Sequence, residues 1–247
     1  MNNLRIRILT IFSLLSAFCF AGNQKNETAN VSLKITLNPA ISHISGVIEY
    51  LFPSDSVFLL TRDLKIESVT ADGSNIVFEK ENPAESNYSS TYKLPFLPKN
   101  LVIKFSGVIS DGSFPKTISN QNRITSQMLE LTDLINWYPR FKNNNNCTFS
   151  LSVLAPKEFG FVTNGIETEN FKTGEIKETR FESAKPVTRL FLIGSAGLKN
   201  TTFTGNNFMV EIYHTKLPDN YVEKMIKSLS APLNFINLFI NRLAQTT

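Results

Sequence analysis

The stretch VSLKITL, residues 31–37, alternates strictly between apolar and polar side chains and is the clearest structural signal in the sequence. In an extended chain, successive side chains point to opposite faces. A period of two therefore places the apolar residues on one face and the polar residues on the other. The stretch predicts a half-buried β-strand.

Segments of the same kind follow along most of the chain, at residues 44–52, 57–60, 64–69, 76–79, 101–109, 149–154, 188–193 and 208–213. Turn-forming pairs separate them, among them Asp72-Gly73, Asp111-Gly112 and Thr173-Gly174. Asp72-Gly73 is flanked by apolar segments and predicts a hairpin. Many short strands without intervening helices predict a mostly β fold, an antiparallel sandwich or saddle of sheets, over residues 22–216.

After Pro218 the period changes to that of a helix. Apolar residues between 222 and 243 recur at helical spacing, and Asp219 stands where an N-cap is needed. Pro232 should bend or split the helix. The half after Pro232 is apolar on nearly all sides, so it needs packing partners on several faces. Residues 217–247 are therefore predicted to form a C-terminal helical segment.

The N-terminus, residues 1–21, has the pattern of a secretory signal peptide. Arg5 and Arg7 precede an apolar run from Ile8 to Phe20, and Ala21 is a small residue at the expected cleavage site. The run is shorter than the roughly 20 residues that a membrane-spanning helix needs. The alternative is a buried first strand or helix. We expect cleavage after Ala21 and export, to the periplasm or outside the cell.

The composition of the expected mature chain excludes several classes of partner. Removing Arg5 and Arg7 leaves 23 of the 25 basic residues against 21 acidic ones, so the net charge falls from +4 to +2. The sequence contains no basic stripe that would indicate a nucleic-acid surface. It also contains no second long apolar run that would indicate a membrane span. Cys147 is then the single cysteine. It predicts no internal disulfide and is interpreted as an ordinary packed residue.

The sequence lacks the residues of a complete catalytic site. His43 and His214 are its only histidines, 171 positions apart, and no H-E-x-x-H motif occurs. A catalytic zinc site usually takes three protein ligands, so we predict no metal site. The segment from Gly194 to Gly197 is one residue short of G-x-S-x-G and is interpreted as a turn. Glycine-rich nucleotide loops are absent. We therefore predict no catalytic residues, no cofactor and no enzymatic activity.

Several pieces nevertheless occur in an order that is similar to a known family. They are GVIEY at 46–50, LKIESVTADG at 64–73, LVIKFSG at 101–107, the stretch from Leu131 to Pro139, FSLSVLAP at 149–156, FVTNG at 161–165 and VEIYHT at 210–215. This order resembles the N-terminal β-domain of the alanyl-aminopeptidase-like zinc metallopeptidases, particularly exported bacterial members. The resemblance covers residues 40–240.

The resemblance implies one substrate-binding residue. In such enzymes the β-domain closes one side of the cleft of a helical, thermolysin-like catalytic domain. It typically offers a Gln or Glu, nine positions before the proline of an aromatic-Pro pair, that binds the free α-amine of the substrate. Glu130 stands nine positions before Pro139, and a carboxylate suits an ammonium. The Ala-Arg usually found between them is replaced at 133–136. The alternative for Glu130 is a solvated strand carboxylate.

The family's catalytic motifs, G-x-M-E-N and H-E-x-x-H, do not occur in this sequence. The tail from Asn241 to Thr247 also departs from the aromatic-Gly and Pro that relatives usually show. The resemblance thus implies a chain truncated before the catalytic motifs, with zinc expected only in the missing domain. Its expected partners are a helical catalytic domain or peptide N-termini. The rival hypothesis is a free-standing periplasmic or secreted β-sandwich module that binds peptides or a protein.

Overall fold

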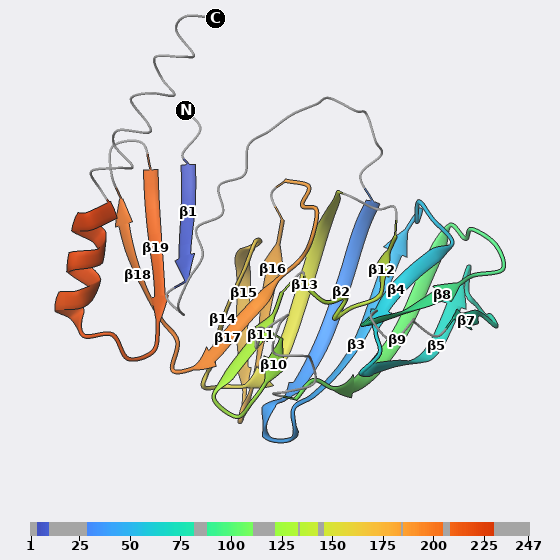
Figure 1. Cartoon of the computed structure of the whole chain (residues 1–247), viewed down its shortest axis with the longest axis horizontal. Helices are drawn as coiled ribbons and strands as arrows, with labels where there is room; N and C mark the ends of the chain where they lie inside the picture. Colours follow the sequence, from blue (N-terminus) through green and yellow to red (C-terminus); the bar gives the residue numbers. More distant parts are fainter. Residues whose placement is uncertain are drawn as a thin grey trace, which may run out of the picture. The chain divides into compact units, whose positions relative to one another are not determined.

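A computed structural model of the chain gives the fold (Figure 1). The structure describes residues 4–9, 29–81, 88–110, 122–132, 134–142, 146–183, 185–204 and 208–229. The chain divides into two compact units. One is Asn23–Ala196, and the other combines Met1–Gly22 with Gly197–Thr247. Strands β18 and β19 thus cluster with the C-terminal helix.

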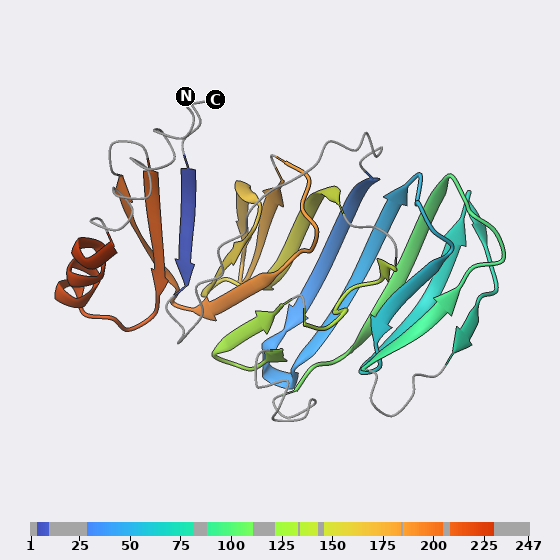
Figure 2. The ribbon, with the colours of Figure 1, turned by 45° about the horizontal axis from the view of Figure 1, so that its top comes forward.

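An eight-stranded sheet is the main element of unit Asn23–Ala196, with the order β15-β16-β13-β2-β3-β9-β5-β6 (Figures 1 and 2). Its strands are β2 (Ala29–Asn38), β3 (His43–Leu51), β5 (Leu64–Ala71), β6 (Ser74–Asn75), β9 (Asn100–Val108), β13 (Cys147–Pro156), β15 (Ile166–Thr173) and β16 (Ile176–Glu182). Neighbours are antiparallel, which confirms the predicted fold class. The exception is the parallel pair of β2 and β13.

Two four-stranded sheets complete this unit, with the orders β10-β11-β17-β14 and β12-β4-β8-β7. Their strands are β4 (Val57–Thr61), β7 (Glu79–Glu81), β8 (Ser89–Lys93), β10 (Arg123–Ile124), β11 (Met128–Leu131), β12 (Arg140–Phe141), β14 (Phe159–Thr163) and β17 (Leu192–Ala196). One apolar core includes residues of all three sheets. Large aromatic side chains fill it, among them Trp137, Phe58 and Phe105, each with no exposed surface.

The alternation in residues 31–37 has the predicted consequence. Val31, Leu33, Ile35 and Leu37 are 6, 1, 0 and 4% exposed, whereas the polar residues between them face solvent. The predicted hairpin at Asp72-Gly73 is also confirmed. Both residues have positive φ, 50° and 82°, as a two-residue turn between twisted strands requires.

Three predicted segments differ from the structure. Residues 76–78 are not in a strand, and they separate β6 from β7. Residues 188–191, predicted to belong to a strand, lie before β17. Two of their carbonyl groups accept hydrogen bonds from side chains and not from a neighbouring strand: Asn164 Nδ2 donates to the carbonyl of Arg189, and Trp137 Nε1 donates to that of Leu190. Residues 194–196, predicted as a turn, lie within β17, and the turn begins at Gly197, where φ is 70°.

The second unit contains β1 (Leu4–Leu9), β18 (Lys199–Thr204) and β19 (Phe208–His214), followed by a helix at 219–229. Val210 and Ile212 pack with Val222 in a small core. The carbonyl of Pro218 accepts hydrogen bonds from the backbone N–H groups of Tyr221 and Val222. Asp219 is therefore in the first helical turn and is not the N-cap. There its carboxylate lies near the positive end of the helix dipole.

Several predictions fall outside the described residues. They are the apolar core of the expected signal peptide after residue 9, the Asp111-Gly112 turn and the helix beyond residue 229. Among the described residues, no helix has the length and apolar character needed to span a bilayer.

Candidate functional site

Glu130, the candidate amine anchor, lies on β11 between β10 and β17. A tight turn joins β10 to β11, and Thr125 closes it. Its backbone N–H donates to the carbonyl of Met128 at 2.8 Å, and its Oγ1 accepts from the Met128 N–H at 3.0 Å. This turn sets the register that places Arg123 directly opposite Glu130.

Arg123 and Glu130 form an ion pair, with 3.2 Å between Arg123 Nε and Glu130 Oε2. Glu130 is only 8% exposed, so it is not the solvated strand carboxylate that the alternative interpretation supposes. A carboxylate in such a place is stable only when a charge or a donor compensates it. Arg123 supplies that compensation and restricts where the carboxylate can lie.

Further hydrogen bonds hold both ends of the β10–β11 hairpin. Asn122 and Thr132 are joined at the open end: the Thr132 N–H donates to Asn122 Oδ1 at 2.7 Å, and Asn122 Nδ2 donates to Thr132 Oγ1 at 3.1 Å. At the turn, Ser195 Oγ on β17 donates to the carbonyl of Gln127 at 3.0 Å. The hairpin therefore offers Glu130 on a supported backbone, which favours a defined position for the carboxylate.

The aromatic-Pro segment after β11 is structural. Trp137 is fully buried, as predicted for a core aromatic, and its Nε1–H donates to the Leu190 carbonyl at 3.2 Å. The hydroxyl of Tyr50 donates to the carbonyl of Pro139. Burial raises the pKa of Tyr138 to about 12 and raises that of Tyr50 well above its usual value. Both hydroxyls are therefore protonated at neutral pH and hold this segment in the core.

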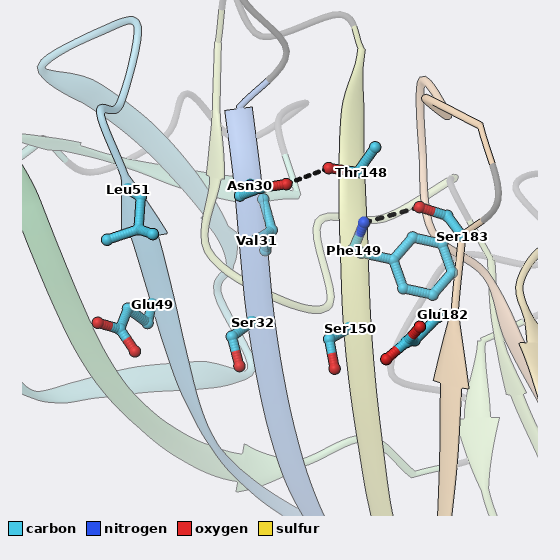
Figure 3. A pocket seen from close by; sticks show the side chains of 10 residues that line it. All are labelled: Asn30, Val31, Ser32, Glu49, Leu51, Thr148, Phe149, Ser150, Glu182 and Ser183. Carbon is cyan, nitrogen blue, oxygen red and sulfur yellow. Dashed lines mark hydrogen bonds between the residues drawn. The ribbon is translucent and has the colours of Figure 1, made fainter. Parts of the chain in front are cut away.

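A recess of about 350 Å³, lined by both polar and apolar side chains, lies near the ends of β2, β3, β13 and β16 (Figure 3). Ser32 and Ser150 lie between the carboxylates of Glu49 and Glu182. Asn30 is hydrogen-bonded to Thr148 at its rim. The ten residues lining the recess include no Lys, Arg or His. The recess thus presents hydroxyls and carboxylates beside the apolar Val31, Leu51 and Phe149, which suits a ligand that has both hydrogen-bond donors and an apolar part.

The histidines and the cysteine are each accounted for by their own strand. His43 begins β3 in one unit, and His214, 5% exposed, ends β19 in the other. Within the described part of the chain, no three His, Cys, Asp or Glu residues are grouped as a metal ion would need. Cys147 Sγ packs 3.7 Å from the Val187 carbonyl. Burial raises its pKa to about 11, so the thiol is protonated at neutral pH and is a poor nucleophile.

Comparison with known proteins supports the fold but not a closer relationship. No family model and no curated protein match the chain. The M1 zinc metallopeptidase from Deinococcus radiodurans is 17% identical over 83% of this chain, with a TM-score of 0.54. A variant of a two-domain M1 zinc metallopeptidase bound to L-tryptophan is 17% identical over 83%, with a TM-score of 0.56. Leukotriene A4 hydrolase from Saccharomyces cerevisiae is 22% identical over 74%, with a TM-score of 0.53.

The match is to part of each enzyme. This chain spans 53% of the Deinococcus protein, 54% of the tryptophan-bound variant and 30% of the yeast enzyme. The resemblance expected from the sequence is thereby confirmed at the level of the fold. The chain has the fold of the N-terminal part of M1 aminopeptidases.

Proposed function

We propose that this chain is a non-catalytic, exported β-domain that shapes the substrate cleft of a zinc aminopeptidase and has no zinc site of its own. The fold shared with M1 zinc metallopeptidases over 83% of the chain is the observation that carries the proposal. The number of available zinc ligands supports the proposal. The sequence has two histidines, which belong to separate units, and these do not supply the ligands of a hydrolytic zinc centre. The catalytic zinc belongs to a helical domain that this chain would serve.

In this proposal Glu130 binds the free amine of a peptide. An ionised carboxylate has about four acceptor positions, so it can bind Arg123 and a substrate ammonium together. The charge-assisted bond to an ammonium is of the stronger kind. Arg123 acts as a positioning residue, because its ion pair with Glu130 restricts where the carboxylate can lie.

Zinc content and peptidase activity of the purified protein test the absence of a catalytic site. Aminoacyl-nitroanilide substrates are incubated with the protein, with and without added zinc, and bound metal is measured by mass spectrometry. We expect no turnover and less than one zinc per chain. Zinc-dependent turnover that survives purification, or one tightly held zinc, would overturn the proposal.

Peptide binding tests the role of Glu130 separately. A peptide with a free N-terminus and its acetylated form are titrated into the wild type and Glu130→Ala, which removes the acceptor altogether. The wild type should prefer the free amine by about tenfold, the value of one charge-assisted bond of roughly 1.4 kcal/mol. Glu130→Ala should lose this preference. An equal preference in both proteins would exclude Glu130 as the anchor.

The recess of Figure 3 favours a second candidate function, a free-standing module that binds peptides or a protein. Its hydroxyls and carboxylates would bind donor groups of a ligand independently of any catalytic domain. In that case, bound peptide should shift the NMR signals of residues 30–32 and 148–150 and leave those of residues 128–131 unchanged.

A further inference from the structure

Strand β19 is the middle strand of a three-stranded sheet in the second unit. It pairs with β18, to which it is antiparallel, and with β1, to which it is parallel. The register with β1 runs from Leu4 opposite Phe208 to Leu9 opposite Tyr213. Both edges of β19 are therefore covered, one of them by the first strand of the chain.

The strand that covers this edge lies within the predicted signal peptide. Residues 4–9 precede the expected cleavage after Ala21, so processing would remove β1 and leave β18 and β19 in the mature chain. An uncovered strand presents a row of unpaired N–H and C=O groups that act as a template for another strand. Processing would thus expose one edge of β19.

The rest of the unit holds β19 independently of β1. Val210 and Ile212 are 1 and 0% exposed and pack with Val222 of the helix, and Met225 and Leu229 pack against this core. Strand β18 pairs with β19 along Lys199–Thr204. These contacts come from residues that remain after cleavage. Strand β19 would therefore stay extended, with its free edge able to pair with another strand.

The register also indicates what kind of segment fits. The apolar positions 4, 6 and 8 lie opposite Phe208, Val210 and Ile212, and Arg5 and Arg7 alternate with them. The partner strand is thus one in which apolar and polar residues alternate with the period of two of a half-buried strand. Main-chain pairing supplies affinity in such strand addition, and the alternate side chains supply selectivity.

We propose that the free edge of β19 is a strand-acceptor site. In the unprocessed chain Leu4–Leu9 fills it, and after processing it accepts an extended, alternately apolar segment of a second polypeptide in parallel register. The proposal shares with the proposed function only the cleavage of the leader on export, and it does not depend on any relation to zinc peptidases. Its failure would therefore leave the peptidase-like role of the chain and of Glu130 untouched.

Hydrogen exchange on the full chain, expressed without processing, tests the site. Ile6→Pro removes a backbone donor and is poorly tolerated inside a paired strand, whereas Ile6→Val keeps the donor and serves as the matched control. Exchange at residues 208–214 should become about tenfold faster in Ile6→Pro and stay unchanged in Ile6→Val. Adding a peptide of sequence NLRIRILT, residues 3–10, should restore slow exchange in Ile6→Pro. The same peptide with proline at the position of Ile6 should not.

Exchange elsewhere in the chain makes each outcome decisive. Residues 101–105 should keep their protection, since they lie in the other unit. Residues 222–229 should also keep it if β19 stays in place without β1. Loss of protection across 222–229 would show that β1 is an integral strand, and the proposal would be wrong. Equal exchange in wild type and Ile6→Pro, or no difference between the two peptides, would also overturn it.

Discussion

The ion pair between Arg123 and Glu130 is the interaction at the candidate site whose contribution to stability can be measured by mutation. The side chains are 24 and 11% exposed, so the pair lies between the exposed and the fully buried classes. Removing Glu130 takes away a charged partner of the partly buried Arg123. We expect Glu130→Ala to lower the free energy of unfolding by about 2 kcal/mol, measured by urea denaturation.

A second ion pair in the same unit provides the control. Lys157 and Glu175 are 2.9 Å apart, with side chains 48 and 83% exposed. An exposed pair contributes little, so Glu175→Ala should change the free energy of unfolding by less than about 0.5 kcal/mol. Similar losses in the two variants would show that burial of Glu130 has no energetic consequence.

Buried acids near Cys147 should make the protein sensitive to alkali. Burial raises the folded-state pKa of Cys147 from 9.0 to about 11 and that of Tyr138 from 10.0 to about 12. The folded state therefore holds protons that the unfolded state has released, and stability falls as pH rises. We expect the free energy of unfolding to decrease from pH 9 upward, with each group contributing a slope of at most about 1.4 kcal/mol per pH unit.

Cys147→Ala isolates the share of the thiol in this pH dependence. The variant loses a packing contact at every pH, which shifts the whole curve by a constant. Between pH 9.0 and about 11, however, its stability should fall less steeply than that of the wild type. Urea titrations across this window measure both slopes. Parallel curves would contradict a raised pKa at Cys147.

Among the elements, strand β9 approaches its neighbour β5 closely at Gly107. A Cβ added there would meet the carbonyl oxygen of Asp63 at 2.3 Å, whereas one added at Gly46 on β3 would meet the ring of Phe105 at 2.6 Å. A ring can rotate, but the Cα of Leu64, 2.9 Å from the added Cβ, belongs to the residue of β5 that is paired with Gly107 and cannot move alone. Gly107→Ala should therefore cost about 3 kcal/mol and more than Gly46→Ala, as overpacking does, measured by urea denaturation.

Gly174 in the turn between β15 and β16 is the control for this comparison. It has a φ of 61°, and no atom lies within 4 Å of an added Cβ. Asparagine tolerates this left-handed conformation better than other residues, so Gly174→Asn should cost less than about 1 kcal/mol. A larger loss there than at Gly107 would mean that close approach between strands does not set the effect.

Strand β15, which pairs with β16, is an element that the alternation of apolar and polar residues does not reveal. Every residue of β15 is exposed, so no apolar alternation marks it in the sequence. Its hydrogen bonds to β16 and the ion pair between Arg180 and Glu169 hold it in the sheet. An edge strand with two solvated faces is stabilised by its neighbour, and the neighbour is known only from the tertiary structure.

For the whole molecule, the two units differ in the size of the apolar cores formed by their described residues. Unit Asn23–Ala196 has an apolar core that joins three sheets, whereas the second unit has a small cluster around Val210, Ile212 and Val222. The free energy of local opening follows the amount of buried apolar contact. Amides of β18 and β19 should therefore exchange at lower urea concentration than those of β2, β3 and β9, measured by native-state hydrogen exchange.

A core variant separates the two opening events. Ile103 is fully buried on β9, and Ile103→Ala should lower the opening free energy of β2, β3 and β9 by about 3 kcal/mol. Exchange of β18 and β19 should stay as in the wild type. If all five strands respond together, the chain unfolds as one cooperative unit.

The predicted domain boundary at 216 follows from the local sequence, whereas the two compact units follow from tertiary contacts. The change of period after Pro218 is local, and the helix at 219–229 follows it. Grouping β18 and β19 with that helix depends on the contacts of Val210 and Ile212 with Val222. Export, cleavage after Ala21 and the amine-binding role of Glu130 remain predictions.

The sequence by itself determined the properties that depend on neighbouring residues. The period of two in residues 31–37 set which side chains of β2 are buried, and Asp72-Gly73 set a hairpin, because both follow from backbone geometry over a few residues. The resemblance to the aminopeptidase β-domain, through the interval to Pro139, made Glu130 a candidate. No such local rule applied to the solvated residues of β15.

Only the tertiary structure decided which distant segments meet. The parallel pairing of β2 with β13, the bond from Trp137 to the Leu190 carbonyl and the burial of Glu130 opposite Arg123 all depend on the packing of whole sheets. A strand offers the same hydrogen-bonding groups to any partner, so its own residues do not specify which strand lies beside it. The partner is chosen by the burial and pairing of all the strands together.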